Sequence, residues 1–256
     1  MSDKPAPRTP AWPPKSAPRL FVKDPLGEGQ TLALEGQQAH YLGKVMRVRE
    51  GDTIIVCDND TGEWAARISE VAKRCVIAIV ETKLRERESV PELWLCPALL
   101  KKDRFDLVLE KATELGAARI QPVITRRCVA DKLNLERATT ITIEAAEQCA
   151  RTALPELSEP IKLDALLKDW PSTRALFFAD EAGGHSAKAA FGAHCGPAAI
   201  LLGPEGGFDD AERAAIRSHR AARAISLGPR ILRGETAAIA ALSVWMATSG
   251  DWACEA

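Results

Sequence analysis

Two apolar segments late in the chain each run directly into a Gly-Pro turn. The segments are Ala198–Leu202 and Arg223–Leu227, and the turns are Gly203-Pro204 and Gly228-Pro229. Short apolar runs bounded by turn residues are typical of strands buried on both faces of a parallel sheet. The spacing therefore predicts two strands whose loops meet at one edge of a sheet, where open α/β sheets bind small ligands.

The first of these turns leads into the start of a helix. Gly203-Pro204-Glu205-Gly206-Gly207 is followed by Asp209 and, three residues further on, by Glu212. This spacing is the capping-box pattern, in which an Asp side chain caps the helix N-terminus. A buried strand, a glycine-rich turn and a capped helix together expose backbone N–H groups. We therefore expect one pocket walled by the two Gly-Pro loops.

Length and composition allow two modest domains, or one large one, with a real core. The chain has 256 residues, of which 46% are apolar and 27% charged, with a net charge of −1. No apolar run is long enough to span a membrane, and no N-terminal signal-peptide pattern is present. The seven cysteines are scattered and never spaced C-x-x-C, so we expect reduced thiols in a cytoplasmic protein.

The N-terminal part divides into a tail and a small β domain. Residues 1–18 are rich in proline and lack apolar periodicity, which predicts a disordered tail. Residues 19–88 contain short strand-like runs between turn signals, which predicts a small β-barrel. The expected strands are Arg19–Lys23, Thr31–Leu34, Thr53–Cys57, Glu63–Ser69 and Val76–Glu81.

One segment of this domain, Gln37–Val48, has the pattern of a short helix. His40, Lys44 and Arg47 lie on it, and Arg49 follows it. These charges form either a solvated helix face or a patch that neutralises RNA phosphates. Because the chain has no overall basic excess, any nucleic-acid surface must be local.

Residues 89–256 form the second predicted domain, after the charged, proline-ended segment 85–91. Apolar runs alternate with segments of helical period, which predicts an α/β domain with a mostly parallel sheet. Asp103 is the expected cap of the first helix and Gly116 its stop. The final helix is apolar on several faces, so it is either buried in the core or pressed against a partner subunit. The expected elements are strands Leu93–Leu99, Arg119–Ile124, Ala175–Ala179, Ala198–Leu202 and Arg223–Leu227, and helices from Asp103, over Leu135–Arg151 and over Glu235–Thr248.

Several common chemistries have no motif in this chain. There is no G-x-x-x-x-G-K-[ST] phosphate loop, no G-x-G-x-x-G after the first strand of the α/β domain, no H-E-x-x-H and no G-x-S-x-G. The histidines lie in different elements, and His185 with His194 is only a weak metal pair. We therefore predict no metal site.

Arg230, Arg233 and Glu235 cluster in the second turn, where Arg233 and Glu235 either pair at a helix start or handle a small charged ligand.

Four blocks of the sequence, taken together and in order, resemble one family. They are Arg19-Leu20-Phe21-Val22 with His40-Tyr41-Leu42 through Arg47 and Gly51-Asp52; Lys102-Asp103-Arg104 with Glu110 to Gly116; Glu144 to Cys149; and Gly203 to Phe208 with Leu227 to Thr236. The chain from Arg19 onward is similar to the 16S ribosomal RNA uridine-N3 methyltransferases of the SPOUT, or α/β-knot, superfamily. Ala150 and Gly234 are small departures from the family pattern.

The resemblance implies a PUA-like, RNA-binding N-terminal barrel and a C-terminal α/β trefoil-knot domain. It implies S-adenosylmethionine as the cofactor, held bent between the two Gly-Pro loops, with glycines where the backbone approaches the ligand. It also implies a homodimer with the knot domain at the interface. The residues implied to bind the cofactor are Leu202, Gly203, Pro204, Glu205, Gly206, Gly207, Leu227, Gly228, Arg230, Ile231 and Leu232.

The implied reaction transfers a methyl group to N3 of an unpaired uridine in small-subunit rRNA. A cation would stabilise the uracil anion, and Arg233 is the first candidate, with Arg104 next. Glu235 either orients the arginine or accepts the proton. The candidates for holding RNA are Arg19, His40, Lys44, Arg47, Arg126 and Arg151. The rival interpretations are methylation at another RNA position, such as a ribose 2′-hydroxyl or a tRNA base, and a non-catalytic RNA-binding assembly factor.

Overall fold

The computed structural model describes residue 13 and residues 16–253, so the predicted tail 1–18 lies almost entirely outside the described residues. The chain forms two compact units. The first comprises the residues up to Glu88 together with Ala150–Ala153, and the second comprises Ser89–Cys149 and the residues from Leu154 onward. No helix among the described residues is long and apolar enough to cross a membrane.

The first unit is built on a five-stranded sheet in the order β1-β3-β4-β5-β2. β1 pairs with β3 in parallel, whereas the other neighbours are antiparallel. The two end strands, β1 and β2, are not paired with each other, so the predicted barrel is a half-barrel open along one side. The strands are β1 (Arg19–Phe21), β2 (Thr31–Glu35), β3 (Thr53–Cys57), β4 (Glu63–Val71) and β5 (Cys75–Arg85).

The predicted helix Gln37–Val48 is present but changes its winding. An α-helical turn, α1 (Gly36–His40), runs into a wider π-helical segment, η1 (Tyr41–Met46). The wider turn keeps Leu42 fully buried and leaves Lys44 exposed. Arg47 ends the segment in the left-handed region at φ 54°. Single π turns of this kind are frequent at functional sites.

A buried carboxylate on β4 links β1 and the end of β5 in the first unit. Glu63 accepts hydrogen bonds from Arg19 at 2.7 Å and from Arg85 at 2.8 Å, and its side chain is 7% exposed. Burial raises the pKa of Glu63, but the hydrogen bonds from Arg85 and Arg19 lower it further, so the net pKa lies below its usual value. The folded state therefore favours the ionised carboxylate.

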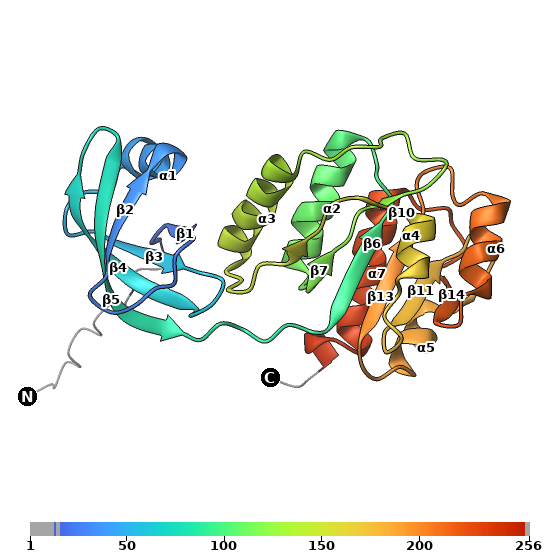
Figure 1. The fold of residues 1–256 in the computed structure, drawn as a ribbon. Helices are drawn as coiled ribbons and strands as arrows, with labels where there is room; N and C mark the ends of the chain where they lie inside the picture. The colour runs from blue at the N-terminus through green and yellow to red at the C-terminus, as the bar shows by residue number, and fades with distance from the viewer. Residues whose placement is uncertain (1–12, 14–15, 254–256) are drawn as a thin grey trace, which may run out of the picture. The chain divides into compact units, whose positions relative to one another are not determined.

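The second unit contains a seven-stranded parallel sheet in the order β12-β14-β11-β13-β6-β7-β9, which confirms the predicted α/β class. Figure 1 shows β6, β13, β11 and β14 side by side. The strands are β6 (Leu93–Pro97), β7 (Arg119–Ile120), β9 (Glu156–Leu157), β11 (Ala175–Ala179), β12 (His185–Ser186), β13 (Ala198–Leu202) and β14 (Ala222–Ser226), and a separate pair joins β8 (Val123–Ile124) to β10 (Ile161–Lys162).

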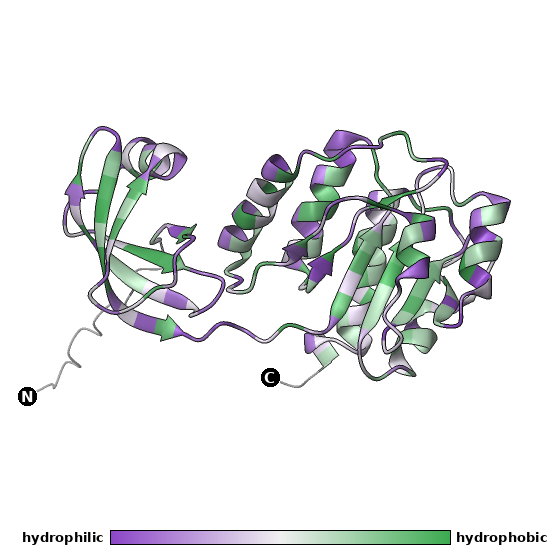
Figure 2. Cartoon of the chain, in the orientation of Figure 1, coloured by the Kyte–Doolittle hydropathy of each residue, from purple (hydrophilic) through white to green (hydrophobic). Residues whose placement is uncertain are grey.

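Successive residues of the central strands feed two apolar cores, one on each face of this sheet. Phe177 of β11 lies in the core under helices α2, α5 and α7, whereas its neighbour Phe178 lies in the core under α4 and α6. In Figure 2 these strands are coloured as hydrophobic along most of their length. The helices are α2 (Lys102–Glu114), α4 (Leu163–Lys168), α5 (Ala187–Gly192), α6 (Asp210–Ser218) and α7 (Gly234–Thr248), with α3 (Leu135–Cys149) packed on α2.

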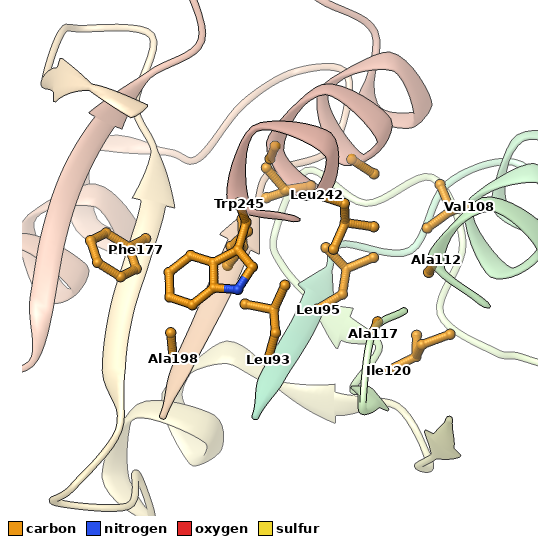
Figure 3. Packing of buried hydrophobic residues seen from close by; sticks show 14 of the residues in the cluster. Leu93, Leu95, Val108, Ala112, Ala117, Ile120, Phe177, Ala198, Leu242 and Trp245 are labelled. Atoms are coloured by element: carbon orange, nitrogen blue, oxygen red, sulfur yellow. The ribbon is translucent and has the colours of Figure 1, made fainter. Parts of the chain in front are cut away.

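The final helix, α7, packs into the core of its own chain, as the first of the two predicted alternatives states, and contact with a partner subunit stays a prediction. Trp245 is 3% exposed and contacts Phe177 and Phe191 with ring centroids 5.9 and 5.2 Å apart. Figure 3 shows the Trp245 indole above Leu93 and Ala198, with Leu242 directed toward Leu95. The helix therefore packs across the middle of the sheet, and this explains its apolar character on several faces.

Several element boundaries differ from the sequence prediction. The predicted cap Asp103 is wrong, because α2 starts from Lys101 without a side-chain cap and Asp103 lies inside its first turn. The predicted strand Arg119–Ile124 is two strands, β7 and β8, separated by Gln121-Pro122, because proline has no N–H to continue the ladder. β14 begins one residue earlier than predicted and leaves Leu227 in the following loop.

The six described cysteines are all free thiols. Burial raises the pKa of Cys57 and of Cys96 to about 12 each, so these two thiols are not nucleophiles at neutral pH. The two groups therefore behave as small apolar core residues.

Glu63→Gln is expected to lower the free energy of unfolding at pH 7 by about 2 kcal/mol, because two charge-assisted hydrogen bonds are lost. The depressed pKa of Glu63 stabilises the fold above its unfolded-state value, and this contribution disappears as the pH falls through the folded-state pKa. Urea titrations at pH 7 and pH 3 should therefore show a difference from wild type that shrinks in acid.

Glu81→Gln is the matched control, because Glu81 makes an exposed ion pair with Arg67 in the same sheet. Such surface pairs contribute at most about 1 kcal/mol. An equal loss in both variants would contradict the structural role of Glu63.

Candidate functional site

A pocket of about 190 Å³ lies at the carboxyl ends of β11, β13 and β14. Because these strands are parallel neighbours, the loops that follow them meet at one edge of the sheet. The pocket is lined by residues of three loops and of the α6 and α7 helices. It contains all of the predicted cofactor-binding residues except Gly206, namely Leu202, Gly203, Pro204, Glu205, Gly207, Leu227, Gly228, Arg230, Ile231 and Leu232.

The first wall is the glycine-rich loop between β13 and α6. Its capping box is confirmed: Asp209 accepts a hydrogen bond from the backbone N–H of Glu212 at 2.7 Å, and Glu212 accepts one from Asp209 N–H at 3.1 Å. The hydrogen bond from Glu212 also lowers the pKa of Asp209. Gly207 has φ +66°, and a Cβ there would lie 2.8 Å from Oε1 of Glu181. The positive φ therefore favours glycine at this position, and a Cβ here would also displace the Glu181 carboxylate.

Two arginines hold this loop from outside the pocket. Arg127 donates to the carbonyl of Gly206 at 2.6 Å, and the Arg126 side chain pairs with Asp209 at 2.9 Å. The backbone N–H of Arg126 also donates to Glu212 at 2.7 Å. Arg126, predicted as an RNA contact, thus lies on the helix cap, although its side chain is 68% exposed. The hydrogen bond to the Gly206 carbonyl and the ion pair with Asp209 together fix the position of the glycine-rich loop.

The second wall is the loop that joins β14 to α7. Gly228 has φ +112° and would meet no atom within 4 Å if it carried a Cβ. The backbone conformation by itself therefore favours glycine here, and close approach of a ligand to this position stays a prediction. Ile231 is 89% exposed. An apolar side chain on an open pocket wall is suited to contact with an apolar or aromatic ligand surface.

The predicted catalytic residues lie at the rim of the two loops. Arg104 of α2 pairs with Glu205 at 2.7 Å, and its Nε lies 3.9 Å from Glu235. Glu235 is 13% exposed, and its Oε2 is buried with no hydrogen-bond partner among the described residues. Arg233 is exposed, forms the N-cap residue of α7 and does not line the pocket. The structure thus joins Arg104, Glu205 and Glu235, and leaves Arg233 beside them facing solvent.

Sequence reasoning missed a third wall, the loop after β11. Asp180, Glu181 and Gly183 line the pocket together with Arg213 of α6. Asp180 is almost fully buried and is bound by Arg217 at 2.6 Å and Arg213 at 3.3 Å. The available signal was the Asp-Glu pair directly after the apolar run Ala175–Ala179, at the same sheet edge as the two glycine turns.

The predicted RNA-binding residues of the first unit separate into two groups. His40 and Lys44 line a hollow of about 710 Å³ that also contains Lys73 and Arg74 of the β4–β5 turn. Arg47 is exposed near them in the chain. By contrast, Arg19 pairs with the buried Glu63, and Arg151 is only 4% exposed. Within residues 16–253, no group of three metal-ligating side chains comes together.

Both units match domains known from RNA methyltransferases. Residues 86–246 match the model of an RNA methyltransferase domain, and residues 34–81 match the model of an RNA methyltransferase PUA domain. The ribosomal RNA small subunit methyltransferase E of Rickettsia conorii is 30% identical, with 88% of this chain and 93% of that protein covered. The Bacillus subtilis protein of the same name is 31% identical, with 88% and 94% covered.

Solved structures agree with these sequence matches. The ribosomal RNA small subunit methyltransferase E of Neisseria gonorrhoeae, bound to S-adenosyl methionine, superposes with a TM-score of 0.84 and 29% identity over 92% of this chain and 99% of that one. A Legionella pneumophila protein solved with bound SAM gives 0.83 and 32% over the same shares. The fold is that of an RNA methyltransferase with a PUA domain. The chain belongs to the ribosomal RNA small subunit methyltransferase E family.

Gly207→Ala is expected to lower the free energy of unfolding by about 1 kcal/mol, because it adds a Cβ at positive φ and against Glu181. Thermal unfolding followed by circular dichroism measures the change. Gly192→Ala is the control, since Gly192 ends α5 and has open space around its Cα. A Gly207→Ala protein as stable as Gly192→Ala would contradict the strained geometry of the loop.

Proposed function

We propose that this protein transfers a methyl group from S-adenosylmethionine to N3 of a specific uridine in 16S rRNA. The observation that carries the proposal is the pocket in which the two Gly-Pro loops converge. The SAM-bound structures of related proteins support the choice of cofactor. The names of the relatives support small-subunit rRNA as the substrate.

The residues of the pocket fit this cofactor. Leu202, Leu227 and Leu232 offer apolar contacts for an adenine ring, and the glycine-rich loop lets backbone atoms approach the ligand. Glu205 and Arg230 supply charge at the same rim. When bound, the cofactor supplies an electrophilic methyl group on a sulfonium centre. The protein's main contribution is then to align the acceptor nitrogen with that methyl group.

Uridine N3 becomes a nucleophile only when its proton leaves. The resulting negative charge spreads onto O2 and O4 of the ring, so a nearby cation stabilises it. Arg104 is already paired with Glu205 and lies close to Glu235. Arg233 has no ion-pair partner among residues 16–253 and faces solvent. We therefore assign the anion-stabilising role to Arg233, with Arg104 next to it.

Glu235 is suited to the proton chemistry at this rim. Its buried, unpartnered Oε2 can accept a proton or hold an arginine in place. The carboxylate also lies in the first turn of α7, where the helix dipole stabilises negative charge. Both roles require the α7 N-terminus to stay fixed, and Gly234 packs against Leu100 without room for a Cβ.

The acceptor base must be unpaired or extruded, because N3 lies on its Watson–Crick edge. His40, Lys44 and Arg47 are exposed and available for RNA phosphates. Arg126 can contribute from the edge of the pocket, whereas Arg19 and Arg151 support the first unit. We further propose a homodimer formed through the trefoil-knot domain, and a cytoplasmic location.

Arg233→Ala is expected to reduce methyl transfer to small-subunit RNA by about 10²-fold or more, because one anion-stabilising cation is lost. Its affinity for S-adenosylmethionine, measured by calorimetry, should stay at the wild-type value. Arg223→Ala, which removes an exposed arginine from β14, serves as the control. Full transfer activity in Arg233→Ala with normal cofactor binding would overturn the catalytic assignment.

Mass mapping of modified nucleotides tests the substrate. Small-subunit rRNA from cells that lack this gene should miss one N3-methyluridine, and the wild-type gene should restore it. Loss of a ribose 2′-O-methyl group or of a tRNA modification would indicate a different methyl acceptor. Unchanged RNA would favour a non-catalytic assembly factor.

A further inference from the structure

Glu181 and Asp180 both follow β11 and line the pocket, and of the two only Glu181 has a side chain that is open to solvent, with 52% exposed against 1% for Asp180. β11 lies between β13 and β14, so the residues that follow β11 stand between the two Gly-Pro loops. The Glu181 carboxylate touches the site of Gly207, where a Cβ would lie 2.8 Å from Oε1 and 3.3 Å from Oε2. Glu181 therefore lies on the pocket wall between the two Gly-Pro loops.

The carboxylate is held by an ion-pair network whose buried member is Asp180. Arg213 donates to Oε1 of Glu181 at 2.7 Å and lies 3.3 Å from Asp180. Asp180 is in turn bound by Arg217 and accepts the backbone N–H of Ala182 at 3.0 Å. These contacts occupy one oxygen of Glu181 and fix its orientation, while its side chain remains 52% exposed.

The charges around Glu181 limit which chemical group of a ligand can bind to its carboxylate. A carboxylate only accepts hydrogen bonds, so its partner must be a donor. The guanidinium of Arg213 already compensates the charge of Glu181 and would repel a second cation such as an α-ammonium group. A neutral group with two adjacent hydroxyl donors suits the site better, and carboxylates in α/β folds bind ribose hydroxyls in this way.

We propose that Glu181 binds the ribose diol of the cofactor, with Arg213 and Asp180 as the residues that position it. This inference rests on the proposed function, because it takes S-adenosylmethionine as the ligand. It adds a third wall to the site, from the loop after β11, and assigns that wall to the sugar. The glycine at position 207 then leaves space for the carboxylate beside the ligand.

The test is calorimetric and needs no RNA. S-adenosylhomocysteine and its 2′,3′-dideoxy analogue are titrated into wild-type protein, Glu181→Ala and Glu181→Gln. Wild type should bind the diol about 10- to 100-fold more tightly than the dideoxy analogue, the range expected for hydrogen bonds to a charged group. Glu181→Ala should bind both compounds equally, at the wild-type affinity for the analogue, and Glu181→Gln should keep part of the preference.

Glu156→Ala is the matched control, because Glu156 lies on β9 at the opposite edge of the sheet and its side chain is 66% exposed. A preference for the diol that survives in Glu181→Ala would overturn the proposal. If Glu181→Ala instead loses its preference for the α-amino group, tested with the deaminated analogue, the carboxylate binds the amino-acid end and the ribose assignment is wrong. Failure of wild type to bind S-adenosylhomocysteine and S-adenosylmethionine would overturn the proposed function as well.

Discussion

Parallel pairing of β11 with both β13 and β14 is the constraint on which the functional site depends. In a parallel sheet all neighbouring strands end at the same edge, so three loops that are far apart in sequence meet there. The pairing also places Phe177 and Phe178 in opposite cores, and helices cover both faces. The packed strands therefore fix the positions at which the three loops begin.

Charged side chains then set the shape of the loops. Arg126 and Arg127 fix the glycine-rich loop from outside, whereas Arg104 links it to the start of α7. Arg213 and Arg217 fix the loop after β11 through Asp180. These arginines are bound by carboxylates or carbonyls, whereas Arg230 and Arg233 of the loop between β14 and α7 are exposed. This contrast supports separate roles for loop-holding and anion-stabilising arginines.

The strong local patterns predicted much of the structure. Strands Ala175–Ala179 and Ala198–Leu202 and the Asp209 capping box could be located from sequence, because burial on both faces and helix capping leave short-range signals. The half-barrel, the winding change at Tyr41 and the break at Pro122 could not be placed with the same accuracy. Their positions depend on which strand pairs with which, and on the need to keep Leu42 in the core.

The sequence by itself determined the α/β class, the two Gly-Pro loops and the resemblance to RNA methyltransferases, because these depend on residue types at short spacing. Only the tertiary structure decided that Asp180 and Glu181 belong to the pocket, that Gly207 and Gly228 have positive φ, and that Arg19 and Arg151 are tied into the first unit. Those properties depend on the distances between residues remote in sequence, and such distances exist only once the sheet has formed.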